Sequence, residues 1–347
     1  MTLLGLSAIE SELAGENSNF IIHNETTGVV DFNRFRSSLY VEDEEAMYRF
    51  NMKVDANIYA AKKAIIDLQK TQDFSLDVPF DTVTKTISSD KGIAYASLYR
   101  LYGVMQEEAH RLSVGLQRVA FGVGRIFTPV DIYNPYNALS LEPSERKGVF
   151  GAHYTYNLNE LSDVEVSITQ DKDRALKSGF RLKGSLLETD MAIIGVSQSD
   201  LTMVGYEVEG DFKGIGLRSE GGYFRDRSSK VEYINMMLGA DYGFEHGGLL
   251  MVEFFKRDDV LNNIEKSYAK EHYLALNYSD MLTVLLSANL ITLYNLDDSS
   301  AFVSPNLLYS LSDEMTLSLG ALVGNGENGS EFKRQGESYY LNWVANF

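Results

Sequence analysis

Apolar and polar residues alternate with a period of two along most of this 347-residue chain. In the clearest stretch, residues 47–59, every second residue is apolar: Tyr48, Phe50, Met52, Val54, Ala56 and Ile58. An α-helix would scatter such residues around its axis, so the alternation predicts an extended strand. About 18 segments of this kind run from residue 19 to the C-terminus, or about 16 if the two weakest are loops. The pattern predicts an all-β protein.

The connections between these segments alternate in length. Short turns such as Val41–Ala46 and Lys213–Gly214 are followed by longer polar loops such as residues 60–92 and 120–148. One short rim, one long rim and a polar face shared by all strands predict a transmembrane antiparallel up-and-down β-barrel. Its apolar face meets lipid, its short turns lie in the periplasm and its long loops lie outside. A soluble β-sandwich, the alternative, would turn the apolar face inward.

The barrel is expected to form one domain, residues 19–347. Residues 1–18 lack a basic start and an apolar core, so they are not an intact signal peptide. We expect them to lie outside the barrel or to be the remnant of a signal. The long loops 60–92 and 120–148 are candidates for folding into the lumen, and residues 59–70 have a helix-like composition. Whether loop 60–92 plugs the pore or covers its rim stays open.

Composition narrows the function. The absence of Cys excludes disulfides, thiolate metal sites and covalent c-type haem, and we expect no cofactor. A net charge of −18 argues against nucleic acid as a partner. The five His are dispersed without the H-E-x-x-H spacing, and no G-x-S-x-G motif occurs, so an enzyme is not expected. Aromatic residues make up 12% of the chain, which suits the two aromatic girdles of a membrane barrel.

Two stretches resemble known outer-membrane proteins. Residues 339–347 (YYLNWVANF) alternate and end on Phe347, which resembles the terminal strand of bacterial outer-membrane β-barrels. Residues 111–137 resemble a motif of porin-like families, in which a Gly-Arg pair closes a strand before P-x-D and N-P elements. The matching positions are Gly115, Arg118, Gly124, Arg125, Pro129, Asp131, Asn134 and Pro135. The resemblance implies a class of protein in the bacterial outer membrane, not a particular solute.

The segment after residue 118 is the main candidate for a constriction. We expect it to fold into the lumen, with Arg118 and Arg125 beside the permeation path and Asp131 pairing with one of them. The alternative is a purely structural Arg–Asp clamp that pins the loop to the wall, and both roles can coexist.

Charged residues on the predicted inner face are unevenly distributed. The candidate pore residues are basic in the first half of the chain (Arg49, Lys53, Arg100 and Arg181) and acidic in the second (Glu207, Glu209, Asp211 and Glu253). In a closed barrel these halves face each other and predict a transverse field across the lumen. Ordinary solvation of a wet interior is the alternative explanation.

Two functions fit these features. The first is an outer-membrane porin that passes ions or small hydrophilic solutes by passive diffusion, since about 16–18 strands leave an aqueous lumen. The second is a barrel sheath that encloses or anchors a partner such as a multihaem cytochrome for electron transfer. A lumen narrowed by its own loops would favour the porin, and a wide lumen lined by small neutral residues would favour the sheath. Membrane lipid is an expected partner, and a homo-oligomer stays open.

Overall fold

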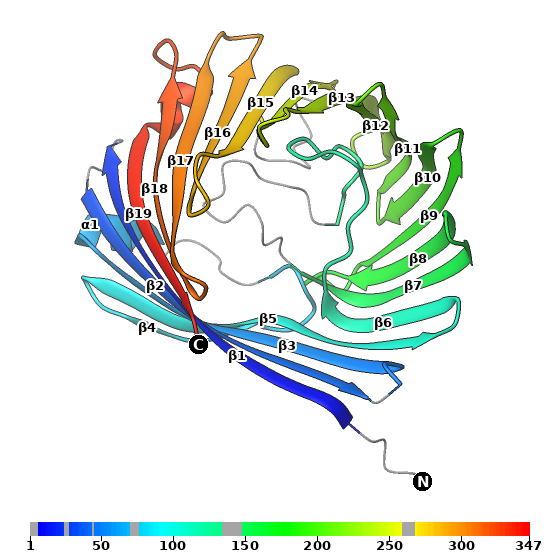
Figure 1. Ribbon diagram of the computed structural model, residues 1–347, viewed down its shortest axis with the longest axis horizontal. Coiled ribbons are helices and arrows are strands. Elements are labelled where there is room, and N and C mark those ends of the chain that lie inside the picture. Colours follow the sequence, from blue (N-terminus) through cyan, green and yellow to red (C-terminus); the bar gives the residue numbers. More distant parts are fainter. Residues whose placement is uncertain (1–5, 24–27, 44, 70–75, 134–147, 259–267) are drawn as a thin grey trace.

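The computed structural model describes residues 6–23, 28–43, 45–69, 76–133, 148–258 and 268–347, and nearly all of them lie in one antiparallel sheet (Figure 1). The strands are β1 (Leu6–His23), β2 (Gly28–Asp43), β3 (Tyr48–Ala61), β4 (Val83–Ser88), β5 (Gly92–Glu107), β6 (His110–Gln117), β7 (Val149–Asn159), β8 (Ser162–Gln170), β9 (Leu176–Leu186), β10 (Thr189–Gln198), β11 (Leu201–Phe212), β12 (Ile215–Asp226), β13 (Val231–Gly243), β14 (Leu249–Arg257), β15 (His272–Met281), β16 (Leu286–Asn295), β17 (Ala301–Ser312), β18 (Met315–Asn325) and β19 (Glu337–Asn346). The helices are α1 (Lys63–Gln69) and the 3-10 helix η1 (Phe332–Gln335).

The sheet closes on itself through its first and last strands. Strand β1 pairs with β2 along one edge and with β19 along the other, where Ala14 lies opposite Asn346. Strand β4 pairs with the extracellular half of β5, and the short β6 pairs with the other half. Strand β4 therefore shares one place in the ring with β6 and is not counted as a separate strand of the barrel. The predicted antiparallel barrel of 18 strands is therefore confirmed.

The N-terminal segment corrects one expectation. Residues 6–18, expected outside the barrel, form most of β1 and hence part of the wall. The signal was weak because polar residues interrupt the outward face of this strand: Ile9 and Leu13 alternate there with Ser11, and Asn17 and Asn19 follow. An alternation with so many polar members on its apolar side does not register as a strand.

The turn between β15 and β16 shows a limit of alternation as a guide. Strand β15 continues to Met281 and the turn occupies residues 282–285, so the apolar Leu282 and Val284 lie in a turn. An apolar run interrupted only by Thr283 is indistinguishable from a strand by alternation alone.

Side chains alternate between lipid and lumen around the ring. The turn Leu187–Glu188 illustrates the short rim, since both residues have the positive φ angles (52° and 63°) that two-residue hairpins of this hand require. The strand β1 starts, and β19 ends, at this same rim (Figure 1).

The loop 60–92 has structure of its own. Helix α1 falls within the predicted helical stretch, and its Ile65 packs with Phe20 and Val30 on the inner side of the wall. Further along, Phe80 contacts Phe150 of β7 edge to face, with ring centroids 5.2 Å apart. Helix α1 thus lies on the inner side of the wall, and Phe80 lies at the extracellular end of β7. None of the helices in the described ranges is long and apolar enough to cross a membrane.

Candidate functional site

The chain leaves the wall after β6 and enters the barrel. Residues 118–133, which we call the inward segment, lie inside the ring (Figure 1, teal trace). Sequence alone placed this segment in the lumen, and its apolar side chains are buried there, with Phe127 and Val130 at most 1% exposed. The last residues of the expected loop, 134–147, lie outside the described residues.

Two apolar clusters hold the inward segment against strands β10–β15. Phe127 stacks on Phe255 of β14, with ring centroids 5.0 Å apart, and meets Tyr273 of β15. Val130 belongs to a second cluster that includes Ile194 and Met203. These two clusters form an apolar core between the inward segment and this wall.

Three glutamates of the wall accept hydrogen bonds from the main chain of the inward segment. Glu253 accepts from the N–H groups of Arg125, Ile126 and Phe127, at 2.8 to 2.9 Å. Because Glu253 is fully buried, these bonds replace the water that its carboxylate would otherwise require. We call Glu207, Glu220 and Glu253 the wall glutamates.

The other two wall glutamates hold the preceding turn. Glu220 accepts from the N–H groups of Val123, Gly124 and Val130, and Glu207 accepts from that of Gly122. Between Gly122 and Phe127, every main-chain N–H is therefore bound to a carboxylate of the wall.

Glycines make this close approach possible. Gly122 has a φ of 102°, which favours glycine, and a Cβ there would lie 2.6 Å from the Glu220 carboxylate. A Cβ on Gly124 would lie 1.9 Å from the carbonyl oxygen of Phe127. Gly124 was singled out in the sequence motif, and the tight turn is a physical reason for its presence.

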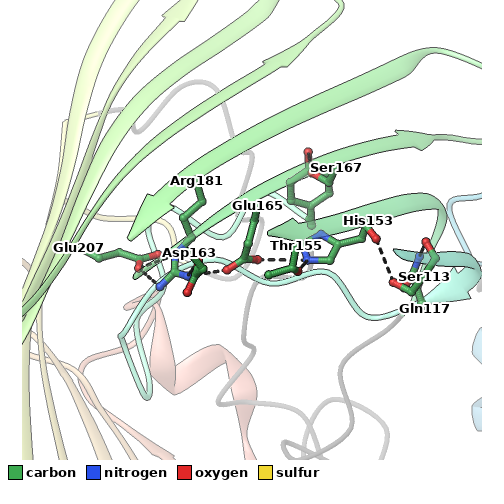
Figure 2. A network of polar contacts seen from close by, with 10 residues as sticks. Ser113, Gln117, His153, Thr155, Asp163, Glu165, Ser167, Arg181 and Glu207 are labelled. Carbon is green, nitrogen blue, oxygen red and sulfur yellow. Dashed lines mark hydrogen bonds and ion pairs between the residues drawn. The ribbon is translucent and has the colours of Figure 1, made fainter. Parts of the chain in front are cut away.

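A chain of polar and charged groups continues from the wall glutamates along the inner wall (Figure 2). Arg181 of β9 contacts Glu207 at 2.8 Å and Glu165 of β8 at 2.6 Å. Glu165 in turn lies 3.1 Å from His153 of β7. Arg181 and Glu207, two of the predicted pore residues, are thus in direct contact. Because Glu207 also binds the main chain of the inward segment, Arg181 is connected to that segment through Glu207.

The predicted basic residues of the inward segment have separate positions. Arg118 is exposed. Arg125 is exposed too, and it contacts Glu209 of β11 at 3.0 Å. Asp131 is buried and accepts a hydrogen bond from the N–H of Tyr133. Arg125 therefore pairs with Glu209, and the wall glutamates anchor the main chain of the inward segment. The pairing of Asp131 with Arg118 or Arg125 stays a prediction.

The remaining predicted residues line other parts of the wall. Arg49 contacts Glu42 at 2.9 Å, and Arg100 lies over the ring of Tyr99 at 4.2 Å. Lys53 lies on the face of β3 that the register with β2 turns toward the lumen. Asp211 accepts a hydrogen bond from the N–H of Gly214 at the periplasmic turn. These residues are spread around the ring, and they do not gather at the inward segment.

Pairing weakens the transverse field that the sequence predicted. In the basic half, Arg34, Arg36 and Arg49 each lie against a carboxylate of a neighbouring strand. In the acidic half, Arg218, which sequence reasoning missed, contacts Asp241 and Glu253. A count of charges strand by strand does not reveal these pairs, because they join residues of neighbouring strands. The register between those strands is what places the opposite charges side by side.

Comparisons with known proteins concern the fold. Neither a family model nor a curated protein matches the chain. Solved structures of similar shape include the outer membrane protein OpdK of Pseudomonas aeruginosa, with a TM-score of 0.63, 10% identity and 99% of both chains covered. OccAB2 of Acinetobacter baumannii matches with a TM-score of 0.61 and 10% identity over 100% of this chain and 99% of that one. OccK2 (OpdF) of Pseudomonas aeruginosa, in complex with glucuronate, gives a TM-score of 0.61 and 11% identity over 99% of both. At these identities the likeness shows the fold, which is that of 18-stranded outer-membrane porins.

Proposed function

We propose that this chain is a porin of the bacterial outer membrane that passes small hydrophilic solutes or ions down their gradients, without a chemical step. The observation that carries the proposal is the inward segment, anchored by the wall glutamates inside a closed barrel. A barrel of this size encloses a water-filled lumen. The fixed inward segment narrows this lumen and leaves a path along the opposite wall.

The solved structures of similar fold support this class of function. One of them is OpdK with vanillate, and OccK2 was solved with glucuronate. Both ligands are small hydrophilic molecules that carry a carboxylate. An exposed guanidinium group such as that of Arg125 suits such solutes, because guanidinium groups bind carboxylates through paired N–H donors.

The sheath remains the second candidate, but no observation favours it. A threaded partner would need a wide lumen lined by small neutral residues. In the described residues the lumen instead contains the inward segment and a wall with charged groups such as Arg181, Glu209 and Arg49. By the criterion set from the sequence, these features favour the porin.

Single-channel recording tests the proposal. The purified protein in planar bilayers should give discrete conductance steps, and its reversal potential under a salt gradient reports the preferred sign of ion. In Glu253→Gln, an amide nitrogen replaces one oxygen that accepts main-chain N–H groups, so the inward segment should loosen and the conductance should become larger and noisier. Glu327→Gln, in an exposed loop, is the matched control.

Each result has a distinct meaning. A folded but silent barrel would contradict the porin and would direct attention to a bound partner. Discrete steps that are identical in wild type and Glu253→Gln would support the channel function. They would contradict the placement of the inward segment at the narrowest part of the pore.

A further inference from the structure

Four polar side chains lie on the lipid-facing side of β1 and β2. Asn17 and Asn19 belong to β1, and Asp31 and Asn33 to β2. Their outward direction follows from the register, because Asn17 lies opposite Trp343 and Asn33 opposite Ile58, apolar residues of the outer surface. We call these four residues the outer polar patch.

The members of the outer polar patch bind one another. The amide of Asn17 donates to Asp31 and to Asn33, at 2.8 Å in both cases. Asn33 also donates to Asp31 at 3.1 Å, and Asn19 donates to Asn17 at 2.6 Å. The carboxylate of Asp31 is thus held by two amide groups, while Asn19 lies exposed at the edge of the patch.

The patch lies within an apolar surface rather than above it. On the side of the extracellular loop it is followed by Ile21 and Val29, which are 48% and 55% exposed. On the periplasmic side it is followed by Leu13 and Phe35, which are also exposed. On the outward faces of β3 and of β5–β19, as far as these strands are described, charged and amide side chains lie only within two residues of a strand end.

Lipid does not suit such a patch. Acyl chains offer no hydrogen-bond partners, so a carboxylate and three amides facing them are costly and mark a site of function or association. Small residues continue the same face beside the patch, among them Ser37, Ala56 and Ala60. In membranes, small residues let two protein surfaces approach closely, and polar side chains then bond across the interface.

We propose that the outer polar patch is the contact between two copies of this chain in the membrane. An amide both donates and accepts, so a patch of amides around one carboxylate is complementary to itself. When two patches meet, the Asn19 amide of each copy reaches the polar atoms of the other, and the amide groups around each Asp31 separate the two carboxylates. This proposal concerns assembly, and it does not depend on which solute the barrel passes.

Cross-linking tests the contact directly, since the chain has no Cys. Asn19→Cys, oxidised in isolated outer membranes, should give a disulfide-linked dimer. Ser197→Cys, an exposed outward position on β10, is the matched control and should stay monomeric. Equal cross-linking of the two variants, or none in Asn19→Cys, would overturn the proposal.

A second variant separates assembly from folding. Asn19→Leu combined with Asp31→Leu makes the face more compatible with lipid, so the barrel should fold and remain heat-modifiable. After extraction in mild detergent, native mass spectrometry should show wild type as an oligomer and the double variant with association about tenfold weaker or more. A monomeric wild type, with or without bound lipid, or an unchanged oligomer in the variant would refute the contact. Conductance of the double variant should persist, which keeps this test apart from that of the porin.

Discussion

At the scale of single residues, the wall glutamates show what alternation can and cannot predict. Period-two counting places Glu207 and Glu253 on the inner face, as the structure does. It does not reveal that their partners are main-chain N–H groups about 80 to 130 positions away. Every residue except proline carries such a group, so the pairing leaves no trace in the sequence, whereas the glycines that permit it do.

Gly122 offers a sharp test at this scale. In Gly122→Ala the new methyl group would meet the Glu220 carboxylate at a positive φ, and we expect the seating of the inward segment to lose about 1–3 kcal/mol. Protease cleavage within the segment should become faster and channel recordings should show additional open levels. The control is Gly195→Ala on β10, where a Cβ meets nothing within 4 Å. If the two variants behave alike, the turn at Gly122 does not constrain the segment.

At the scale of elements, regular alternation is a sufficient guide and its interruptions mark the errors. The eighteen strands of the ring each correspond to an expected segment, because lipid on one side and water on the other impose one pattern on every strand. Strand β1 was underestimated where Asn17 and Asn19 replace apolar residues on its outward face. Strand β4 was missed because it lies inside the long loop 60–92, where no neighbouring turn sets its limits.

The loop that contains η1 is another element whose position depends on carboxylates. Glu331 accepts from the hydroxyl of Tyr273 and the amide of Asn295, and its own N–H donates to Asp298. Burial acts to raise the pKa of Asp298, but hydrogen bonds from Ser300 and Glu331 outweigh it and hold this pKa below its ordinary value. The loop is therefore fixed in part by the carboxylate of Asp298, whose lowered pKa keeps it charged at neutral pH.

On acidification, we expect this loop to stay fixed until the pH falls below the ordinary pKa of an Asp side chain. Because the pKa of Asp298 is lowered in the folded state, its contribution to stability is complete above the ordinary Asp pKa of about 4 and is lost as the pH falls through the lower, folded value. Hydrogen exchange at the N–H groups of Glu331 and Phe332 should stay slow, after correction for intrinsic rates, down to about pH 4. Asp298→Asn should make the exchange of these N–H groups faster already at neutral pH. Asp313→Asn, in an exposed turn at the other rim, should leave their exchange rate unchanged. Protection that Asp298→Asn leaves intact would show that other contacts fix the loop.

At the scale of the whole molecule, closure is the property that organises the rest. Each described strand of the ring has two neighbours, so its main-chain donors and acceptors are paired within the sheet and do not face lipid, where unpaired groups would be prohibitively costly. The seam runs between β1 and β19, and its last pair joins the main chain of Leu13 to that of Phe347 in both directions. Strands β1 and β19 are thus structural parts of one wall.

This seam distinguishes the structure from the expectation that residues 1–18 lie outside the barrel. Deletion of residues 6–18 would be harmless if they lay outside, but in the structure it removes most of the strand that joins β2 to β19. Two unpaired edges would then face lipid, so the variant should fail to give the heat-modifiable folded form on gels and should not accumulate in the outer membrane. An epitope of similar length inserted between Ser228 and Ser229, in an exposed turn, controls for altered chain length and should leave the barrel folded. A folded, heat-modifiable deletion variant would mean that β2 and β19 can close the ring without β1.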